Sequence, residues 1–228
     1  MGHKMSEGSI IGTLGEGAVH SYIKDYIEPD RAKQEIDYLG FVADIKNEEG
    51  ITEVQTSSFE RLSDKLTAFL ENDRVTVVFP AISEKQLVTL DKSGEVLSIR
   101  KSPKSVKPIS ACTELYKIRD FLKNPALTVK IFELSCIEYK TLGKNERGKM
   151  KRRSVSKLIG ITELKEVSDY KALLLPPDMP NEFFAAEYKN KSRLKDRPAY
   201  AALGVLIALG IIEKGEKRGR AHIYKTGN

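Results

Sequence analysis

Three short β-type runs in close succession, early in the chain, constrain its fold more than any other feature. The first run alternates apolar and polar residues over residues 34–39 and is ended by Gly40. The second covers residues 41–45, the third covers residues 51–56, and a turn at residues 47–50 joins them as a hairpin. Because side chains alternate along a strand, this hairpin places its polar side chains in a defined register.

The segments on either side of these runs predict helices and a buried strand. Residues 17–26 have apolar side chains at helical spacing, and residues 58–70 form a second amphipathic segment that a serine can cap. Residues 74–79 are β-branched and end at Pro80, which is typical of a buried central strand. The order of helix, three-strand meander, helix and strand predicts an α+β protein.

The middle of the chain predicts further elements and then a break. A hairpin over residues 85–100, a helix over 113–122 and a strand over 127–138 follow the first core. Residues 140–153 contain glycines and many charges, which favours a loop or linker. We therefore expect a first domain over residues 10–140, followed by a basic linker and connecting segment over residues 141–174.

The pattern changes from residue 175, after which prolines punctuate the sequence. Residues 181–189 predict a short helix, and residues 199–209 predict an apolar helix that begins at Pro198. Two short β-type runs then flank a charged turn at residues 214–220. Helix, helix and β-hairpin make a small C-terminal domain over residues 175–228.

The hairpin carries the side chains that suggest chemistry. If its strands pair about the turn, Asp44 comes alongside Glu53, and Gln55 projects from the same face as Glu53. Two converging carboxylates suit a hard divalent ion such as Mg²⁺ (or Mn²⁺), which keeps waters for a substrate phosphate. Asp44 also lies in a largely apolar strand, where burying an unpaired carboxylate is costly. The alternative is that these are ordinary solvated side chains of a hairpin.

Asp44 followed by Glu53 and Gln55, on the second and third strands after a helix, resembles the PD-(D/E)XK nuclease superfamily. The resemblance implies a restriction-endonuclease-like core, with Asp44 and Glu53 as metal ligands and Gln55 as the third active-site position. Two departures stand out: Ala43 replaces the usual proline, and Gln55 replaces the usual lysine. We expect Lys65, on the following helix, to reach inward and substitute for that lysine.

Other acidic and basic side chains lie near this motif in the sequence. Glu35 opens the first strand and is a candidate for the extra acidic catalytic residue of such sites, although a surface carboxylate is the commoner role. His20 and Lys24 share one face of the first helix. This face either carries a pair on the protein surface, which we favour, or lines the site.

The C-terminal segment of residues 181–225 resembles a winged helix, a helix-turn-helix variant with a β-hairpin wing. The resemblance implies DNA contacts at the start of the second helix and at the wing. A further basic cluster follows residue 99, and a denser run lies between residues 144 and 157. The DNA-binding candidates are Arg100, Lys101, Lys104, Arg193, Lys195, Arg197, Lys217, Arg218 and Arg220.

The composition sets the remaining expectations. The net charge is +6, and its basic residues are clustered, which favours a polyanionic partner. Cys112 and Cys136 are expected to be reduced core thiols of a cytoplasmic protein, and we expect no membrane partner. A homodimer is also to be considered, because cutting both strands requires two sites.

Three hypotheses therefore stand. The first is a metal-dependent DNA endonuclease targeted by a winged helix. The second is a non-catalytic DNA-binding regulator or defence protein with a degenerate nuclease core, which the glutamine at position 55 suggests. The third is an assembly protein without a nucleic-acid role, since many winged helices mediate protein contacts.

Overall fold

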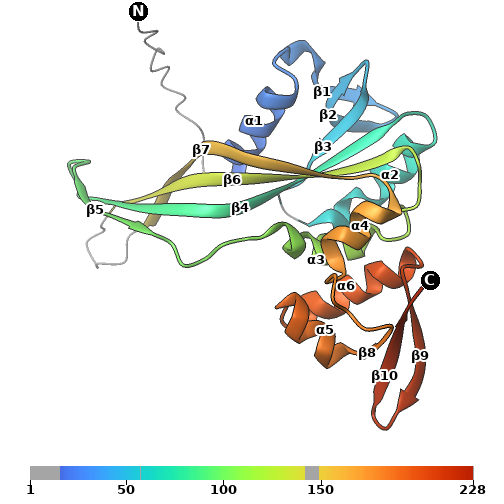
Figure 1. The fold of residues 1–228 in the computed structure, drawn as a ribbon. Helices are drawn as coiled ribbons and strands as arrows, with labels where there is room; N and C mark the ends of the chain where they lie inside the picture. The colour runs from blue at the N-terminus through green and yellow to red at the C-terminus, as the bar shows by residue number, and fades with distance from the viewer. Residues whose placement is uncertain (1–15, 57, 142–148, 228) are drawn as a thin grey trace, which may run out of the picture.

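A long mixed β-sheet with helices on both faces forms the larger part of the protein, and a smaller module hangs from one of those helical layers (Figure 1). The computed structural model describes residues 16–56, 58–141 and 149–227. The sheet has seven strands in the order β1-β2-β3-β4-β6-β7, with β5 paired to β4. The predicted α+β class is therefore correct.

The first half of the sheet follows the predicted element order. Helix α1 (Glu16–Ile27) precedes the antiparallel meander of β1 (Gln34–Tyr38), β2 (Phe41–Asn47) and β3 (Gly50–Val54). A 3₁₀ turn (Phe59–Leu62), capped by the Ser58 hydroxyl, then leads into α2 (Ser63–Leu70) and β4 (Val75–Leu90). Strands β3 and β4 are parallel, because α2 carries the chain back across one face of the sheet.

The second half of the sheet extends beyond the helices as a long arm (Figure 1). Strand β5 (Val96–Lys101) pairs antiparallel with the end of β4, and β6 (Leu127–Thr141) runs parallel to β4 along its whole length. Strand β7 (Lys149–Leu164) closes this edge against β6. The helical connection between β5 and β6 is made of α3 (Cys112–Leu115) between 3₁₀ turns at Pro108–Ala111 and Tyr116–Ile118.

The strand that was predicted to end at Pro80 continues for another ten residues. A proline lacks the amide hydrogen and is tolerated only where a strand edge is free. Strand β4 has β3 as a neighbour up to Val78 and gains β5 only at Gln86. Between these points β4 is paired only with β6, so Pro80 occupies a stretch with one open edge.

The loop predicted over residues 140–153 is also wrong in part, because β6 extends to Thr141 and β7 begins at Lys149. Residues 142–148, which include Lys144, lie outside the described part of the chain. One of these charges, Arg153, is compatible with a strand because it is paired across the sheet. Glu138, only 4% exposed, accepts from Arg153 Nε at 2.9 Å and lies 3.3 Å from Lys85 Nζ.

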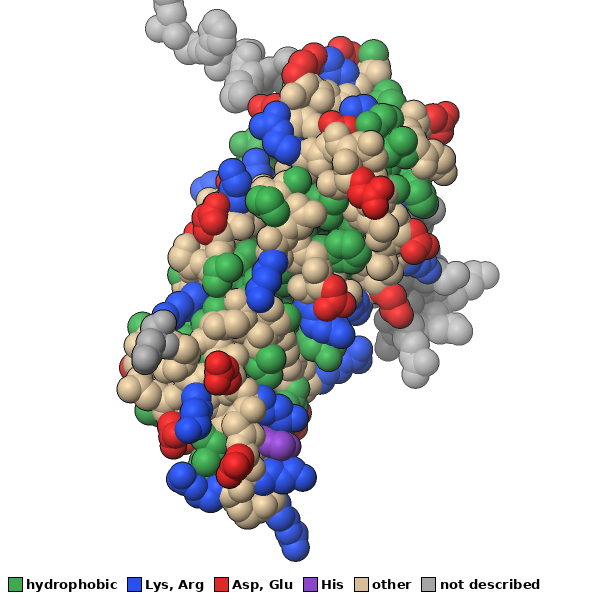
Figure 2. Space-filling view, turned by 90° about the vertical axis from the view of Figure 1, so that its right-hand side faces the viewer, with side chains coloured by type: hydrophobic (Ala, Val, Ile, Leu, Met, Phe, Trp, Pro, Cys, Tyr) green, Lys and Arg blue, Asp and Glu red, His purple; other side chains and the backbone are tan. Residues whose placement is uncertain are grey.

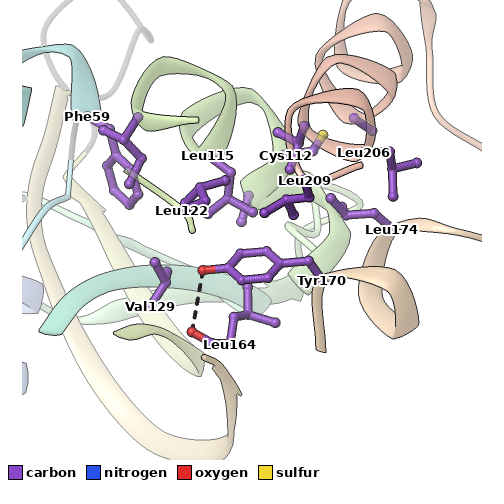
Figure 3. Packing of buried hydrophobic residues seen from close by; sticks show 14 of the residues in the cluster. Phe59, Cys112, Leu115, Leu122, Val129, Leu164, Tyr170, Leu174, Leu206 and Leu209 are labelled. Atoms are coloured by element: carbon purple, nitrogen blue, oxygen red, sulfur yellow. Dashed lines mark hydrogen bonds between the residues drawn. The ribbon is translucent and has the colours of Figure 1, made fainter. Parts of the chain in front are cut away.

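Two apolar clusters hold the layers together. On one face of the sheet, Val19 and Ile23 of α1 pack against Val54, Val78 and neighbouring residues of β6. On the other face, a larger cluster joins α2, α3 and α4 (Val167–Leu174) to the sheet. Figure 3 shows Tyr170 of α4 within this larger cluster, where its hydroxyl donates to the Leu164 carbonyl at 3.4 Å.

The C-terminal module consists of β8 (Glu182–Phe184), α5 (Ala185–Ser192), α6 (Asp196–Ala208), β9 (Ile212–Arg218) and β10 (Ala221–Thr226). Its three strands pair antiparallel in the order β8-β10-β9. The start of the predicted helix over residues 181–189 is therefore a strand. A β8 strand here gives the β9–β10 hairpin a third partner.

The module shares its core with the larger sheet, since the same apolar cluster continues into α6 (Figure 3). Cys112 of α3 lies against the start of α6, with its thiol 3.3 Å from the Pro198 carbonyl oxygen. The apolar face of α6 therefore packs on the larger domain. Of the helices in the described ranges, none has the length and apolar character needed to cross a membrane.

Candidate functional site

The β2–β3 hairpin brings Asp44 and Glu53 together, as the sequence predicts. The ladder pairs Ile45 with Thr52, and the next position along it is Asp44 opposite Glu53. Here each carboxylate replaces a backbone partner: the Asp44 amide donates to Glu53 Oε1 at 3.3 Å, and the Val54 amide donates to Asp44 Oδ2 at 2.7 Å. We call this point, with its two carboxylates, the acidic corner.

A lysine from α2 completes one side of the acidic corner. Lys65 Nζ donates to Glu53 Oε2 at 2.8 Å and to the Val42 carbonyl at 2.6 Å. The parallel β3–α2–β4 crossover explains this position, because it lays α2 over the end of β3. The expectation that Lys65 reaches inward is confirmed.

A histidine from α1 completes the other side. His20 Nε2 lies 3.2 Å from Asp44 Oδ2, and its side chain is 28% exposed. Its neighbour on the helix, Lys24, is only 6% exposed and donates to Glu35 Oε1 at 2.7 Å. The interpretation of His20 and Lys24 as a surface pair is therefore wrong: α1 packs on the sheet through Val19 and Ile23, which carries both basic side chains inward.

Glu35 lies at the rim rather than inside the acidic corner. Its side chain is 70% exposed, and its hydrogen bond and charge pairing with Lys24 lower the pKa of the carboxyl group. Together with His20 and Lys24 it lines a hollow of about 350 Å³ beside α1. Glu35 thus borders an open approach near Asp44, in keeping with the commoner role of a surface carboxylate.

Gln55 extends β3 beyond Glu53, and its side chain bonds to the loop that follows. The backbone of Gln55 continues the sheet, since its amide donates to the Val78 carbonyl at 2.9 Å. Its side-chain amide donates to the Ser58 carbonyl at 3.1 Å. The described hydrogen bonds of Gln55 thus hold the start of the loop before α2, and Lys65 is the side chain that contacts Glu53.

The two carboxyl groups have pKa values displaced in opposite directions. Burial, followed by repulsion from Asp44, raises the pKa of Glu53, although Lys65 acts against both effects. Burial also acts to raise the pKa of Asp44, but the hydrogen bond and charge of His20, with the Val54 amide, outweigh it, so the net pKa is lowered. Paired acids with opposed environments are typical of sites that handle protons or cations.

The donor chemistry of the acidic corner fits one kind of metal ion. Within the described ranges, no three His, Cys, Asp or Glu side chains form a group that could hold a metal on their own. Mg²⁺ commonly takes only one or two carboxylates from a protein and completes its shell with water and substrate phosphate. The hydrogen bonds described for the Asp44 side chain all end at Oδ2, which leaves Asp44 Oδ1 for such an ion. Glu53 accepts at both oxygens, with the longer contact of 3.3 Å at Oε1.

The predicted DNA-binding residues fall into three places, two of them in the C-terminal module. Arg193, Lys195 and Arg197 are exposed around the start of α6, and Lys217, Arg218 and Arg220 are exposed on the β9–β10 hairpin. Figure 2 shows Lys and Arg side chains gathered at this hairpin end of the molecule.

The cluster of Arg100, Lys101 and Lys104 lies on the arm instead. All three side chains are exposed, and Lys101 pairs with Gln86 of β4. Val78, which pairs with Val54 beside the acidic corner, comes eight residues earlier on that strand. At about 3.3 Å per residue, the backbone of Lys101 lies roughly 26 Å from the acidic corner.

Sequence reasoning missed a group of residues between the sheet's helices and α6. A groove there, which we call the junction groove, has a volume of about 500 Å³. The residues that line it come from segments some 80 residues apart, so no local sequence pattern predicts the groove. The i, i+4 spacing of Tyr200 and Gly204 on one helix face is the one local sign of a packing surface there. The side chains that line it include Glu60, Tyr116, Lys117, Arg119, Arg197 and Tyr200.

Comparison with known proteins shows relatives without an assigned role. A protein of Treponema pallidum (strain Nichols), named "Uncharacterized protein", is 28% identical over 220 residues, which cover 94% of this chain and 87% of the relative. No solved structure matches the chain. The sequence matches a family model over residues 17–168, which span the acidic corner and the whole large sheet. The chain therefore belongs to the family described as "Domain of unknown function (DUF8091)".

Proposed function

We propose that the protein is a metal-dependent nuclease whose acidic corner hydrolyses phosphodiester bonds of DNA. The single observation that carries the proposal is the meeting of Asp44, Glu53 and Lys65 at the end of one hairpin. The element order of α1, β1 to β3, α2 and β4, with β3 parallel to β4, supports a restriction-endonuclease-like core of the PD-(D/E)XK type. Resemblance to that superfamily implies two acidic ligands and a lysine, which here comes from α2 instead of β3.

In this proposal each side chain has a defined role. Asp44 and Glu53 are the residues that would hold Mg²⁺ or Mn²⁺. A divalent ion bound there lowers the pKa of a bound water and neutralises charge on the scissile phosphate. Lys65, oriented by Glu53 and the Val42 carbonyl, positions the water and stabilises the developing negative charge. His20 orients the Asp44 carboxylate from the opposite side.

The C-terminal module supplies the DNA contacts of the proposal. Helix α4, strand β8, helices α5 and α6 and the β9–β10 hairpin resemble a winged helix in order and in strand pairing. Its exposed hairpin cations suit phosphates of a duplex, and binding through them weakens as salt is added.

The test is nicking of supercoiled plasmid and of branched DNA by the full-length protein in Mg²⁺, in Mn²⁺ and in EDTA. We expect cation-dependent nicking that Asp44→Asn reduces at least 100-fold or so, since loss of a mere outer-shell partner already costs about 10- to 100-fold. Asp37→Asn, an exposed aspartate on the neighbouring strand β1, is the matched control. Absence of nicking by the wild-type protein, or equal nicking by Asp44→Asn, overturns the proposal.

A second candidate function is a DNA-binding regulator with a degenerate nuclease core. The observation that favours it is that both carboxylates already have basic partners, His20 and Lys65, which stabilise the corner without a metal. This candidate predicts salt-sensitive duplex binding in EDTA that Asp44→Asn leaves unchanged, with no cation-dependent nicking of any DNA.

A further inference from the structure

The junction groove combines aromatic and cationic side chains in a way that the proposed function does not use. Tyr200 of α6 is 53% exposed and Tyr116 is 39% exposed, and tyrosine, with an apolar ring and a polar tip, is enriched at interfaces. Three cations line the groove, against the single carboxylate of Glu60. Such a surface offers flat apolar rings beside positive charge.

The structure holds these side chains in place rather than leaving them free. The Arg119 guanidinium carbon lies 4.4 Å from the centroid of the Tyr116 ring, and its NH1 donates to the Tyr116 carbonyl at 2.9 Å. Gly204 lets α6 approach this ring, because a Cβ at that position would lie 2.3 Å from a ring carbon of Tyr116. The two walls of the groove are thus fixed to each other.

The junction groove is also connected to the acidic corner through one loop residue. Lys117 Nζ donates to the Ser58 hydroxyl at 2.8 Å, and Gln55 donates to the Ser58 carbonyl at 3.1 Å. The loop that begins beside Glu53 therefore ends at the lip of the groove. A nucleic-acid strand bound at the acidic corner would follow this loop to the groove.

The surroundings of α6 determine which form of nucleic acid fits. A recognition helix must protrude to enter a major groove that is about 12 Å wide. Helix α6 instead contacts α3, α4, α5 and β9, and one of its faces is fully buried. A hollow of about 500 Å³ lies in the size range of small-ligand sites, which suits a nucleotide and excludes a duplex.

We propose that the junction groove binds an unpaired stretch of a nucleic-acid strand, with a base stacked on Tyr200 and its phosphate held by Arg197 and Arg119. Stacking on an aromatic ring beside backbone-binding cations is how proteins hold single strands without reading their sequence. The proposal rests on the proposed function only in taking nucleic acid as the ligand. It adds that the substrate has an unpaired segment next to a duplex.

The experiment measures binding in EDTA, where no cleavage intervenes. Fluorescence anisotropy of the full-length protein is recorded with a labelled oligo-thymidylate and with a blunt duplex of equal length. We expect Tyr200→Ala to weaken oligo-thymidylate binding between about 5-fold and 100-fold, the usual range for one stacked base, and Tyr200→Phe to retain it. Arg197→Ala weakens binding of the same probe and makes that binding less dependent on salt. The duplex affinity is expected to change much less in all three variants.

The matched control is Tyr26→Ala, a tyrosine on α1 that is 52% exposed and lies outside the groove. Thermal unfolding of every variant shows whether it is folded. The groove proposal is overturned if the wild-type protein does not bind oligo-thymidylate. It is equally overturned if Tyr200→Ala binds it like wild type, or if the duplex loses as much affinity as the single strand.

These outcomes are separable from those of the proposed nuclease. If the protein binds oligo-thymidylate through Tyr200 but never nicks DNA, the groove proposal is supported and the nuclease proposal is overturned. Cation-dependent nicking with a Tyr200-independent affinity for single strands does the reverse.

Discussion

The acidic corner and the C-terminal module carry their charge in opposite ways. In the corner, Glu53 and Asp44 are largely withdrawn from solvent, and each has a basic partner on a different helix. In the module, most cations stand exposed on a hairpin and at the start of α6. Buried charges depend on geometry and on their partners, whereas exposed charges act over a distance and are screened by salt.

This difference predicts that the acidic corner determines the rate of the reaction and that the exposed cations of the module determine affinity. Moving one atom in the acidic corner changes the protonation and position of every other group in it, so single substitutions there have large effects. Substituting one of several exposed cations leaves the others in place, so its effect is small. The predictions below test this contrast in order of size.

The largest effect is expected from a comparison of Lys65 with Gln55. Lys65→Met removes the only basic group that contacts Glu53 among the described residues, so we expect the rate of cation-dependent nicking to fall about 100- to 1000-fold. Gln55→Ala breaks a bond to the Ser58 carbonyl and to neither carboxylate, so it is expected to cost less than the roughly 10-fold at which the loss of a true outer-shell partner begins. Initial rates of plasmid nicking measure both, and a larger loss in Gln55→Ala contradicts the assignment.

Lys65→Met is also expected to destabilise the fold, because it leaves the Glu53 carboxylate buried without its partner. Breaking a buried ion pair costs about 3 kcal/mol at the lower end of the usual range, and Lys65 is itself partly exposed. The pKa of Glu53, already raised by burial, rises further in this variant. Urea unfolding measures the resulting loss of stability.

The sign of its pH dependence follows from that raised pKa. When the pKa of a carboxyl group is higher in the folded than in the unfolded protein, the folded protein loses stability as pH rises through the folded-state pKa. The deficit of Lys65→Met is therefore small near about pH 5 and larger near about pH 8. The double variant Glu53→Gln/Lys65→Met is the control, because it removes the charge and restores most of the stability. A deficit that does not change with pH contradicts the buried-charge explanation.

A smaller effect is expected where the two regions meet, at Gly204. Gly204→Ala places a Cβ 2.3 Å from the Tyr116 ring and forces that ring to shift. Overpacking lowers the free energy of unfolding by about 1–3 kcal/mol. The better helix propensity of alanine offsets about 0.5–1 kcal/mol of this loss. In a Tyr116→Ala background the clash is absent, so Gly204→Ala is expected to stabilise the protein. Thermal unfolding of the wild type, the two single variants and the double variant shows whether the effect of Gly204→Ala on stability changes sign.

The acidic corner was largely predictable from sequence because its geometry is local. A glycine-ended turn and two alternating runs fix the register of β2 and β3, which alone brings Asp44 beside Glu53. The approach of Lys65 followed from placing a helix directly after β3. The contribution of His20 was missed, because it depends on which face of α1 packs against the sheet.

The junction groove and the arm were not predictable in this way. Pro80 appeared to end β4, and only the absence of a second neighbour at that point lets the strand continue. The charges of β7 suggested a loop, although Arg153 pairs with a buried glutamate on β6. The groove arises from contact between α3 and α6, which are far apart in sequence. Pairings of this kind are set by tertiary packing, which overrides local pattern.

The smallest effect is expected from single cations of the β9–β10 hairpin. Lys217→Ala or Arg220→Ala removes one phosphate contact, so the dependence of log affinity on log salt should become shallower by about one for blunt duplex DNA. Arg100→Ala, on the arm roughly 30 Å from the acidic corner at about 3.3 Å per residue, provides the comparison with a third basic region. If Arg100→Ala lowers the slope and the hairpin variants do not, the duplex lies along the arm and the module has another role. If all three lower it equally, one duplex spans both surfaces, and affinity is shared among exposed cations while cleavage depends on the few groups of the acidic corner.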